Sequence, residues 1–134
     1  MPAINQPIEA GYYTCEASVL KASAVVPYGT LAMQVSGKIR PAVTGVAGSV
    51  LLGVSFQNLN ETTAADVTLS SPAIFGRGMV VEMDGKSGDL PTASLLGAAV
   101  YIEDGSTVKA TAATDDLSVT LVGIRGSTFL VRLP

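Results

Sequence analysis

The residue types of this chain limit the chemistry that it can perform. The 134-residue sequence contains no histidine, the side chain that most often acts as a general base or metal ligand near neutral pH. A serine–histidine or cysteine–histidine nucleophile pair therefore cannot form within the chain. One cysteine without histidine cannot supply the four ligands of a typical zinc site. We expect a protein that is not an enzyme and that binds no cofactor or metal.

Two pairs of adjacent acids are the remaining candidates for acid–base chemistry, Glu103-Asp104 and Asp115-Asp116. Such catalysis needs two carboxylates that face one site and have different pKa values. Neighbouring residues on a strand point to opposite faces, and both pairs lie beside turn signals. We interpret them as solvated loop residues. The sequence around Asp115-Asp116 also offers too few oxygen ligands for calcium.

Two glycine-containing motifs and the single cysteine have structural interpretations. Gly85-Lys86-Ser87 resembles the end of a phosphate-binding loop, but Val80 stands where that motif requires its first glycine. A hairpin turn is the better interpretation. Gly76-Arg77-Gly78 indicates a corner, or an interface at which Arg77 meets a carboxylate of a neighbouring molecule. Cys15 has no cationic neighbour in the sequence to lower its pKa, so we interpret it as a structural or incidental thiol.

Composition indicates a protein covered by copies of itself or by a partner. Charged residues are 14% of the sequence, well below the roughly 25% of typical soluble domains. A net charge of −3 without a basic cluster argues against nucleic-acid binding. The sequence shows no apolar run long enough to span a membrane and no signal-peptide pattern, so we expect no membrane partner. A lone cysteine fits synthesis in a reducing cytoplasm.

A pattern of strands and glycine turns recurs at a spacing of about seventy residues. The sequence from Gly97 to Gly105 matches the one from Gly29 to Gly37, and Val122-Gly123-Ile124 matches Leu52-Gly53-Val54. We predict two copies of one β-unit, at about residues 25–70 and 95–134. A glycine inside each apolar strand indicates a tight bend, so valine at Gly53 or Gly123 is expected to cost about 1–3 kcal/mol.

The fold class predicted from these patterns is all-β. Short runs alternate apolar and polar residues and end at glycine-marked turns, which is typical of a small barrel or sandwich. Residues 90–96 allow one helical turn. Whether the two units form one barrel or two lobes stays open. We therefore expect one β-domain over residues 18–134, a small β-barrel or β-tulip built from two pseudo-repeats.

Residues 1–17 are predicted to form an extended arm that packs on a neighbour. Pro2 and Pro7 exclude a long helix there. The alternatives are a frayed terminus or a strand on the chain's own domain. Tyrosines at an arm tip would be interface anchors, because each offers a large area with few torsions to order. The candidate interface residues are Ile4, Ile8, Tyr12, Tyr13 and Arg77.

Several short motifs together resemble the small capsid decoration, or cement, proteins of tailed bacteriophages. The resemblance covers most of the chain after about residue 18 and excludes residues 58–66. It rests on Val25-Val26-Pro27-Tyr28-Gly29-Thr30-Leu31, Leu52-Gly53-Val54, Gly97-Ala98-Ala99-Val100-Tyr101-Ile102, Val122-Gly123-Ile124 and Val131-Arg132-Leu133.

The resemblance implies a structural virion protein made in the host cytoplasm. Such proteins bind the outside of an expanded head, often as homotrimers, and clamp neighbouring subunits of the major capsid protein. The family has no catalytic residues to transfer. The alternatives are a tail-fibre, baseplate or adhesin-type binding module, and an enzyme or accessory subunit whose site lies between chains.

Overall fold

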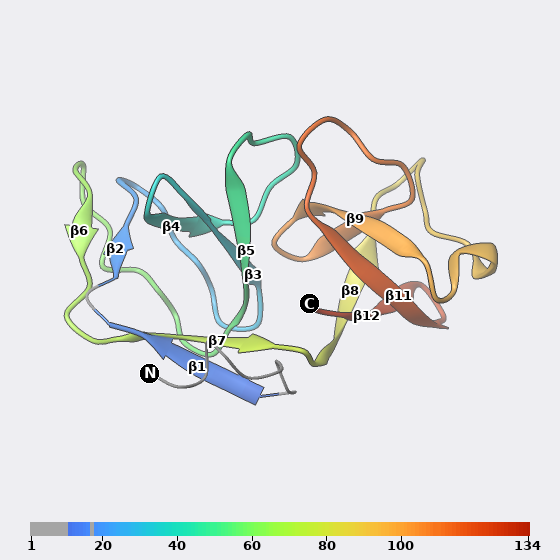
Figure 1. The fold of residues 1–134 in the computed structure, drawn as a ribbon, viewed down its shortest axis with the longest axis horizontal. Helices are drawn as coiled ribbons and strands as arrows, with labels where there is room; N and C mark the ends of the chain where they lie inside the picture. Colours follow the sequence, from blue (N-terminus) through green and yellow to red (C-terminus); the bar gives the residue numbers. More distant parts are fainter. Residues whose placement is uncertain (1–10, 17) are drawn as a thin grey trace.

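The computed structural model describes residues 11–16 and 18–134, and these residues form an all-β structure (Figure 1). One short 3-10 helix, η2, lies within the expected helical turn. The strands are β1 (Gly11–Cys15), β2 (Val19–Leu20), β3 (Leu31–Val35), β4 (Lys38–Pro41), β5 (Ser49–Ser55), β6 (Val67–Thr68), β7 (Ala73–Arg77), β8 (Val80–Gly85), β9 (Ala99–Asp104), β10 (Thr107–Lys109), β11 (Ser118–Arg125) and β12 (Thr128–Arg132), with η2 at Ala93–Leu95.

The strands form two curled sheets that lie side by side (Figure 1). The second sheet is a closed barrel in the order β10-β8-β12-β11-β9. The first is seven-stranded, in the order β1-β7-β5-β3-β4-β2-β6. Its two edge strands are β1 and β6. Along the chain β1 is followed by β2, which pairs with β6, and β6 is followed by β7, which pairs with β1. The first sheet therefore curls back toward itself, and we call it the first barrel.

Both barrels have the same strand connections, which confirms the predicted duplication. In each, a first strand (β1 with β2, or β8) pairs in parallel with the second strand of a hairpin (β3-β4 or β9-β10). The next strand (β5 or β11) pairs with the start of that hairpin. The last strand of each barrel pairs with two others. In the first barrel, β7 pairs with β5 and β1, and β6 pairs with β2. In the second barrel, β12 pairs with β11 and β8. The repeats are thus about 11–77 and 80–132, because the first begins at β1 and the second at β8, earlier than the predicted residues 25 and 95.

The domain boundary predicted at residue 17 is wrong. Residues Gly11–Cys15 are strand β1 and pair with β7 along their whole length, from Gly11 opposite Arg77 to Cys15 opposite Ala73. This segment therefore belongs to the first barrel, as the alternative of a strand on its own domain allowed. Ile4 and Ile8 lie outside the described residues.

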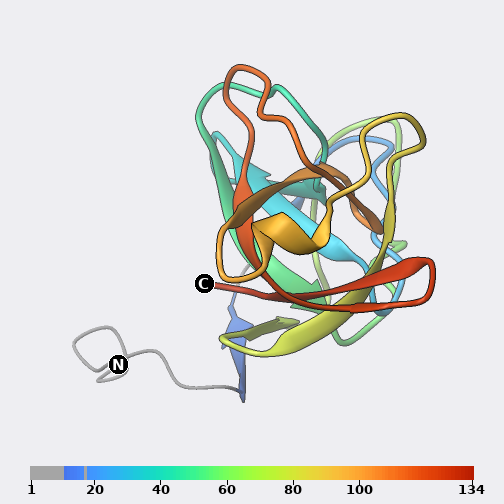
Figure 2. The ribbon, with the colours of Figure 1, turned by 90° about the vertical axis from the view of Figure 1, so that its right-hand side faces the viewer.

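One apolar core joins the two barrels, and a second fills the first barrel. Strand β3 separates them, because Ala32 points into the first barrel while Leu31 and Met33 point to the other side. Leu31 and Met33 pack with core residues of the second repeat, among them Ile102 and Leu121. In Figure 2 the second barrel faces the viewer and the first lies behind it. The two lobes therefore share one core.

Gly53 occupies the tightest backbone contact of the described glycines. A bulge at Leu52 breaks the register between β3 and β5, and Gly53 adopts a φ of 127°, where side chains are strained. A Cβ atom there would lie 2.0 Å from the backbone oxygen of Gly76. Gly123 lies beside a bulge of β11 in its pairing with β12, and the nearest atoms to a Cβ there would belong to the side chain of Leu130, at 3.1 Å. Of these two glycines, Gly53 is therefore the one that closely approaches another backbone.

We expect the two glycines to differ in their effect on stability, contrary to the equal effect predicted from the repeat. Gly53→Ala should cost about 3 kcal/mol or more, because the clash involves backbone on both sides. Gly123→Ala should cost less than about 1 kcal/mol, because the Leu130 side chain can shift. Urea unfolding of both variants measures this. Equal midpoints would show that the Gly53–Gly76 approach does not constrain the fold.

Candidate functional site

The predicted interface residues Tyr13 and Arg77 come together on the paired strands β1 and β7 of the first barrel. Tyr13 lies opposite Phe75 in the β1–β7 pair, and the two rings are 6.0 Å apart. The Tyr13 hydroxyl donates a hydrogen bond of 2.7 Å to the backbone oxygen of Leu52. The Arg77 guanidinium lies 5.6 Å from the centre of the Tyr13 ring, a cation–π distance. Both residues therefore stabilise the barrel, and Tyr13 is not an exposed anchor.

A small pocket opens at the end of β1. Its volume is about 190 Å³, and Cys15, Ser18, Gln34 and Leu52 are among its lining residues. Burial raises the pKa of the neighbouring Tyr13 phenol to about 12, with a further contribution from Cys15. Burial also raises the pKa of the Cys15 thiol, which keeps it in the unreactive thiol form. The cysteine is thus structural here, in agreement with its sequence context.

Tyr12 points outward and belongs to an aromatic patch in which Phe56 lies between two exposed tyrosines. Its side chain is 73% exposed, and its ring lies 5.5 Å from that of Phe56. Tyr28, 61% exposed, contacts the other side of Phe56 at 6.2 Å. Gly76 lies opposite Tyr12 in the sheet, and its missing side chain leaves room for Phe56 and Met79. We call Tyr12, Tyr28, Phe56 and Met79 the aromatic patch.

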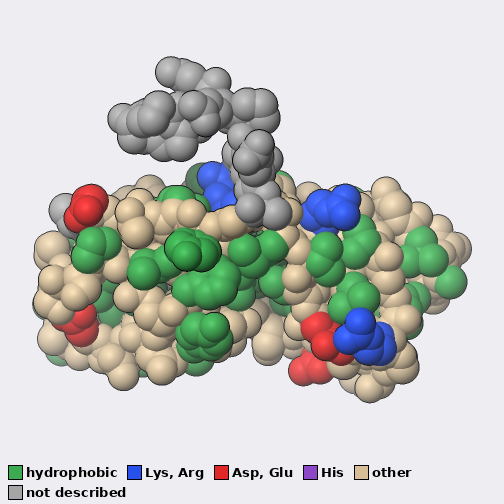
Figure 3. Space-filling model, turned by 90° about the horizontal axis from the view of Figure 1, so that it is seen from below, with side chains coloured by type: hydrophobic (Ala, Val, Ile, Leu, Met, Phe, Trp, Pro, Cys, Tyr) green, Lys and Arg blue, Asp and Glu red, His purple; other side chains and the backbone are tan. Residues whose placement is uncertain are grey.

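The aromatic patch lies where the first barrel meets the link to the second. Met79 belongs to that link, between β7 and β8. Figure 3 shows this lower face, with apolar side chains gathered near the middle of the molecule. The sequence did not lead us to expect Tyr28, Phe56 and Met79 in one patch, in which Tyr28 is exposed and Phe56 and Met79 are partly buried. The turn Pro27-Tyr28-Gly29 was a usable signal, because a large aromatic at the tip of a turn has little to pack against.

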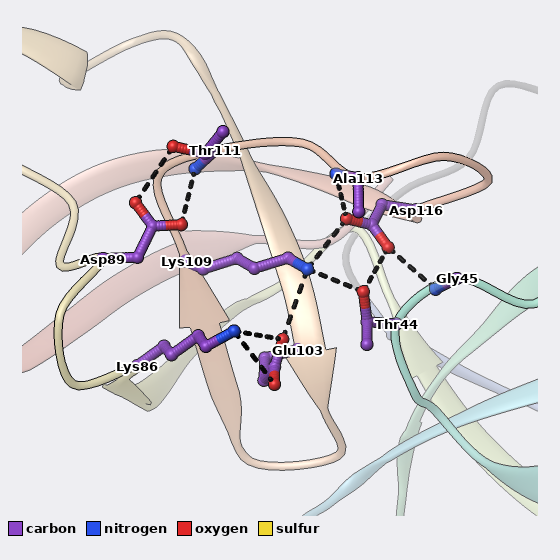
Figure 4. Close-up of polar contacts among 9 residues, drawn as sticks. All are labelled: Thr44, Gly45, Lys86, Asp89, Glu103, Lys109, Thr111, Ala113 and Asp116. Carbon is purple, nitrogen blue, oxygen red and sulfur yellow. Dashed lines mark hydrogen bonds and ion pairs between the residues drawn. The ribbon is translucent and has the colours of Figure 1, made fainter.

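A second cluster is polar and joins the two barrels (Figure 4). The ammonium group of Lys109, on β10, lies 3.0 Å from a carboxylate oxygen of Asp116 and 3.2 Å from one of Glu103. It also donates a hydrogen bond of 2.6 Å to the hydroxyl of Thr44, in the first barrel. The side chains of Lys109 and Asp116 are 5% and 1% exposed. The interpretation of Asp116 as a solvated loop residue is therefore wrong, whereas Asp115 is exposed as predicted.

Asp116 holds three backbone segments together. It accepts hydrogen bonds from the Thr44 hydroxyl, from the Gly45 N–H at 2.8 Å and from the Ala113 N–H at 2.6 Å. Burial alone would raise the pKa of Asp116, but these bonds and Lys109 outweigh it and lower the pKa to about 2. Burial alone would lower the pKa of Lys109, but its bonds to Asp116 and Glu103 raise it. Both groups are therefore charged at neutral pH.

The charged state of Lys109 decides what the polar cluster can do. A threonine hydroxyl 2.6 Å from a lysine has the spacing of a nucleophile and its general base. A base must be neutral to accept the proton, and two neighbouring carboxylates keep this lysine protonated. Lys109 therefore donates to Thr44, and the cluster works as an ion-paired connection between the barrels.

Among residues 11–16 and 18–134, no group of three or more His, Cys, Asp or Glu side chains is placed to hold a metal ion. No helix within the same residues is long and apolar enough to cross a membrane. Comparisons with protein families, curated proteins and solved structures found no match.

We predict that the connection through Asp116 stabilises the fold in a pH-dependent way. Because folding depresses the pKa of Asp116, its contribution is complete above the unfolded pKa of about 4 and is lost as the pH falls toward 2. Asp116→Asn should therefore cost about 2 kcal/mol at pH 7. Urea unfolding of the variant and the wild type between pH 2 and pH 7 measures the difference.

The control for this experiment is Asp66→Asn. Asp66 forms a 2.7 Å ion pair with Lys38, but both side chains are solvent-accessible, at 34% and 45%. Water and salt screen such pairs, so little change in stability is expected. A gap between wild type and Asp116→Asn that stays constant down to pH 2 would contradict the assignment.

Proposed function

We propose that this protein is a structural virion protein that decorates the outside of an expanded bacteriophage head. It clamps neighbouring subunits of the major capsid protein and acts as a homotrimer. The observation that carries the proposal is an exposed aromatic patch mounted on a rigid pair of barrels. The motif resemblance to phage decoration proteins points the same way.

Rigidity supports the clamping part of the proposal, because a clamp transmits force only if its parts do not hinge. The two barrels share an apolar core that includes Leu31 and Met33. Two backbone hydrogen bonds cross between them, from the Leu31 N–H to the Gly105 oxygen at 2.8 Å and from the Thr44 N–H to the Glu103 oxygen at 2.9 Å. The ion pair of Lys109 and Asp116 adds a polar connection. Domain motion is thereby opposed at three kinds of contact.

The aromatic patch supports the attachment part of the proposal. Tyrosine and phenylalanine are enriched among residues that dominate protein interfaces, because each buries a large area at small entropic cost. Three patches in one trimer bind together when the shell repeats at matching spacing, which multiplies modest single contacts. Attachment to the capsid therefore needs no large interface on each copy.

A second candidate function is a cell-surface binding module of the tail-fibre or adhesin type. The observation that favours it is the pair of exposed tyrosines, since sugar sites commonly present aromatic faces. Binding of the purified chain to a glycan array would favour this candidate over capsid decoration.

We predict that Tyr12→Ser and Tyr28→Ser each weaken attachment to expanded phage heads by at least about tenfold, because each removes an exposed aromatic anchor. Cosedimentation with purified expanded heads measures attachment, and immature shells serve as the comparison. The matched control is Val50→Ser, which removes a 59% exposed apolar side chain. Val50 lies near the start of β5, whereas Phe56 of the aromatic patch follows the end of this strand. Equal binding by all variants would reject the patch as the attachment surface, and failure of the wild type to bind any head would reject capsid decoration.

A further inference from the structure

The duplication pairs Lys109 with Arg40 of the first barrel. In the first barrel, Leu20 pairs in parallel with Ile39, and in the second, Gly85 pairs in parallel with Val108. Ile39 and Val108 are both buried core residues. The residues that follow them, Arg40 and Lys109, thus hold equivalent places on the two barrels. Each barrel carries one cation at this place.

The two cations differ in their partners. Lys109 is bound by Glu103, Asp116 and Thr44. The corresponding parts of the first barrel, strand β3 and residues 41–48, contain no acidic residue. Among the described residues Arg40 forms no ion pair, and its Nε atom is buried without a hydrogen-bond partner. A buried donor without a partner is costly, so the first barrel carries a cation whose carboxylate is missing.

The contact at Lys109 shows how one barrel docks on the next. The loop between β4 and β5 of the first barrel, residues 42–48, supplies Thr44 and Gly45 to the polar cluster of the second. Its equivalent in the second barrel is the loop between β10 and β11, residues 110–117. Residues 111–115 of this loop are exposed, and they include the carboxylate of Asp115. The second barrel therefore presents the same docking element, with an acid added.

We propose that the loop 110–117 of a second copy of this chain docks on Arg40, with its Asp115 as the partner of the Arg40 guanidinium. The contact between copies then repeats the contact between the two barrels within one copy. Charge complementarity supports this occupant. Arg40, without a carboxylate, lies at the place of Lys109. The exposed Asp115 lies on the loop equivalent to the one that brings Thr44 to Lys109. An arginine binds a carboxylate through two parallel hydrogen bonds, which fixes orientation.

This inference rests on the self-association part of the proposed function and does not depend on capsid binding. The experiment therefore uses the purified chain without phage heads. Analytical ultracentrifugation measures the assembly of the wild type, Arg40→Glu and Asp115→Arg over a concentration series. We expect the wild type to self-associate and each single variant to weaken association at least about tenfold through like-charge repulsion. The double variant Arg40→Glu/Asp115→Arg should restore association, because the reversed charges then face each other at every contact.

Two controls keep the test decisive. Arg125→Glu makes the same charge change at a 71% exposed side chain beside the β11–β12 turn, and it should assemble like the wild type. The second control, Arg40→Gln, removes the charge of Arg40 without introducing a negative charge. Circular dichroism confirms that each variant is folded. A monomeric wild type, an Arg40→Glu variant that assembles normally, or a double variant that fails to reassociate would each overturn the inference. The head-binding assay with Tyr12→Ser remains a separate measurement.

Discussion

The apolar core between the two barrels is the interaction on which the rest of the structure depends. Strand β3 sends Ala32 into one core and Leu31 and Met33 into the other, so neither barrel is complete without it. Both of the latter side chains are almost fully buried, and burial of this kind contributes about 1.5–3 kcal/mol per side chain. The shared core converts two small sheets into one body. Each barrel alone would expose this apolar surface to water.

The polar cluster at Lys109 is a consequence of that union. Its ammonium and the Asp116 carboxylate are excluded from water because loops of both barrels cover them. Such a pair is tolerated only when its remaining hydrogen-bonding capacity is filled, and Thr44, Gly45 and Ala113 fill that of Asp116. The pair therefore adds specificity to a contact that the apolar core already favours, since it matches only one relative placement of the barrels.

Duplication explains how one strand arrangement carries different surfaces on the first and the second repeat. The repeats keep the same strand connections, yet the second carries acids at Glu103 and Asp116 where the first carries none. The first repeat instead keeps Arg40 partly exposed and presents Tyr12 and Tyr28 on its surface. Lys109 and Asp116 of the second repeat are thus saturated by contacts within the chain, whereas Asp115 stays exposed. The first retains groups suited to contacts with other molecules, which is the basis of both proposals above.

The sequence by itself determined the all-β class, the duplication and the bend at Gly53, because alternation of apolar residues and glycine turns are local signals. It did not determine the faces of Tyr12 and Tyr13, the burial of Asp116 or the place of β1 in the first barrel. Each of these depends on the register between segments about 60 to 70 residues apart, as in the pairing of Tyr12 with Gly76 and of Asp116 with Thr44. A one-residue slip in such a register moves a side chain from the surface to the core, so only the tertiary structure decided them.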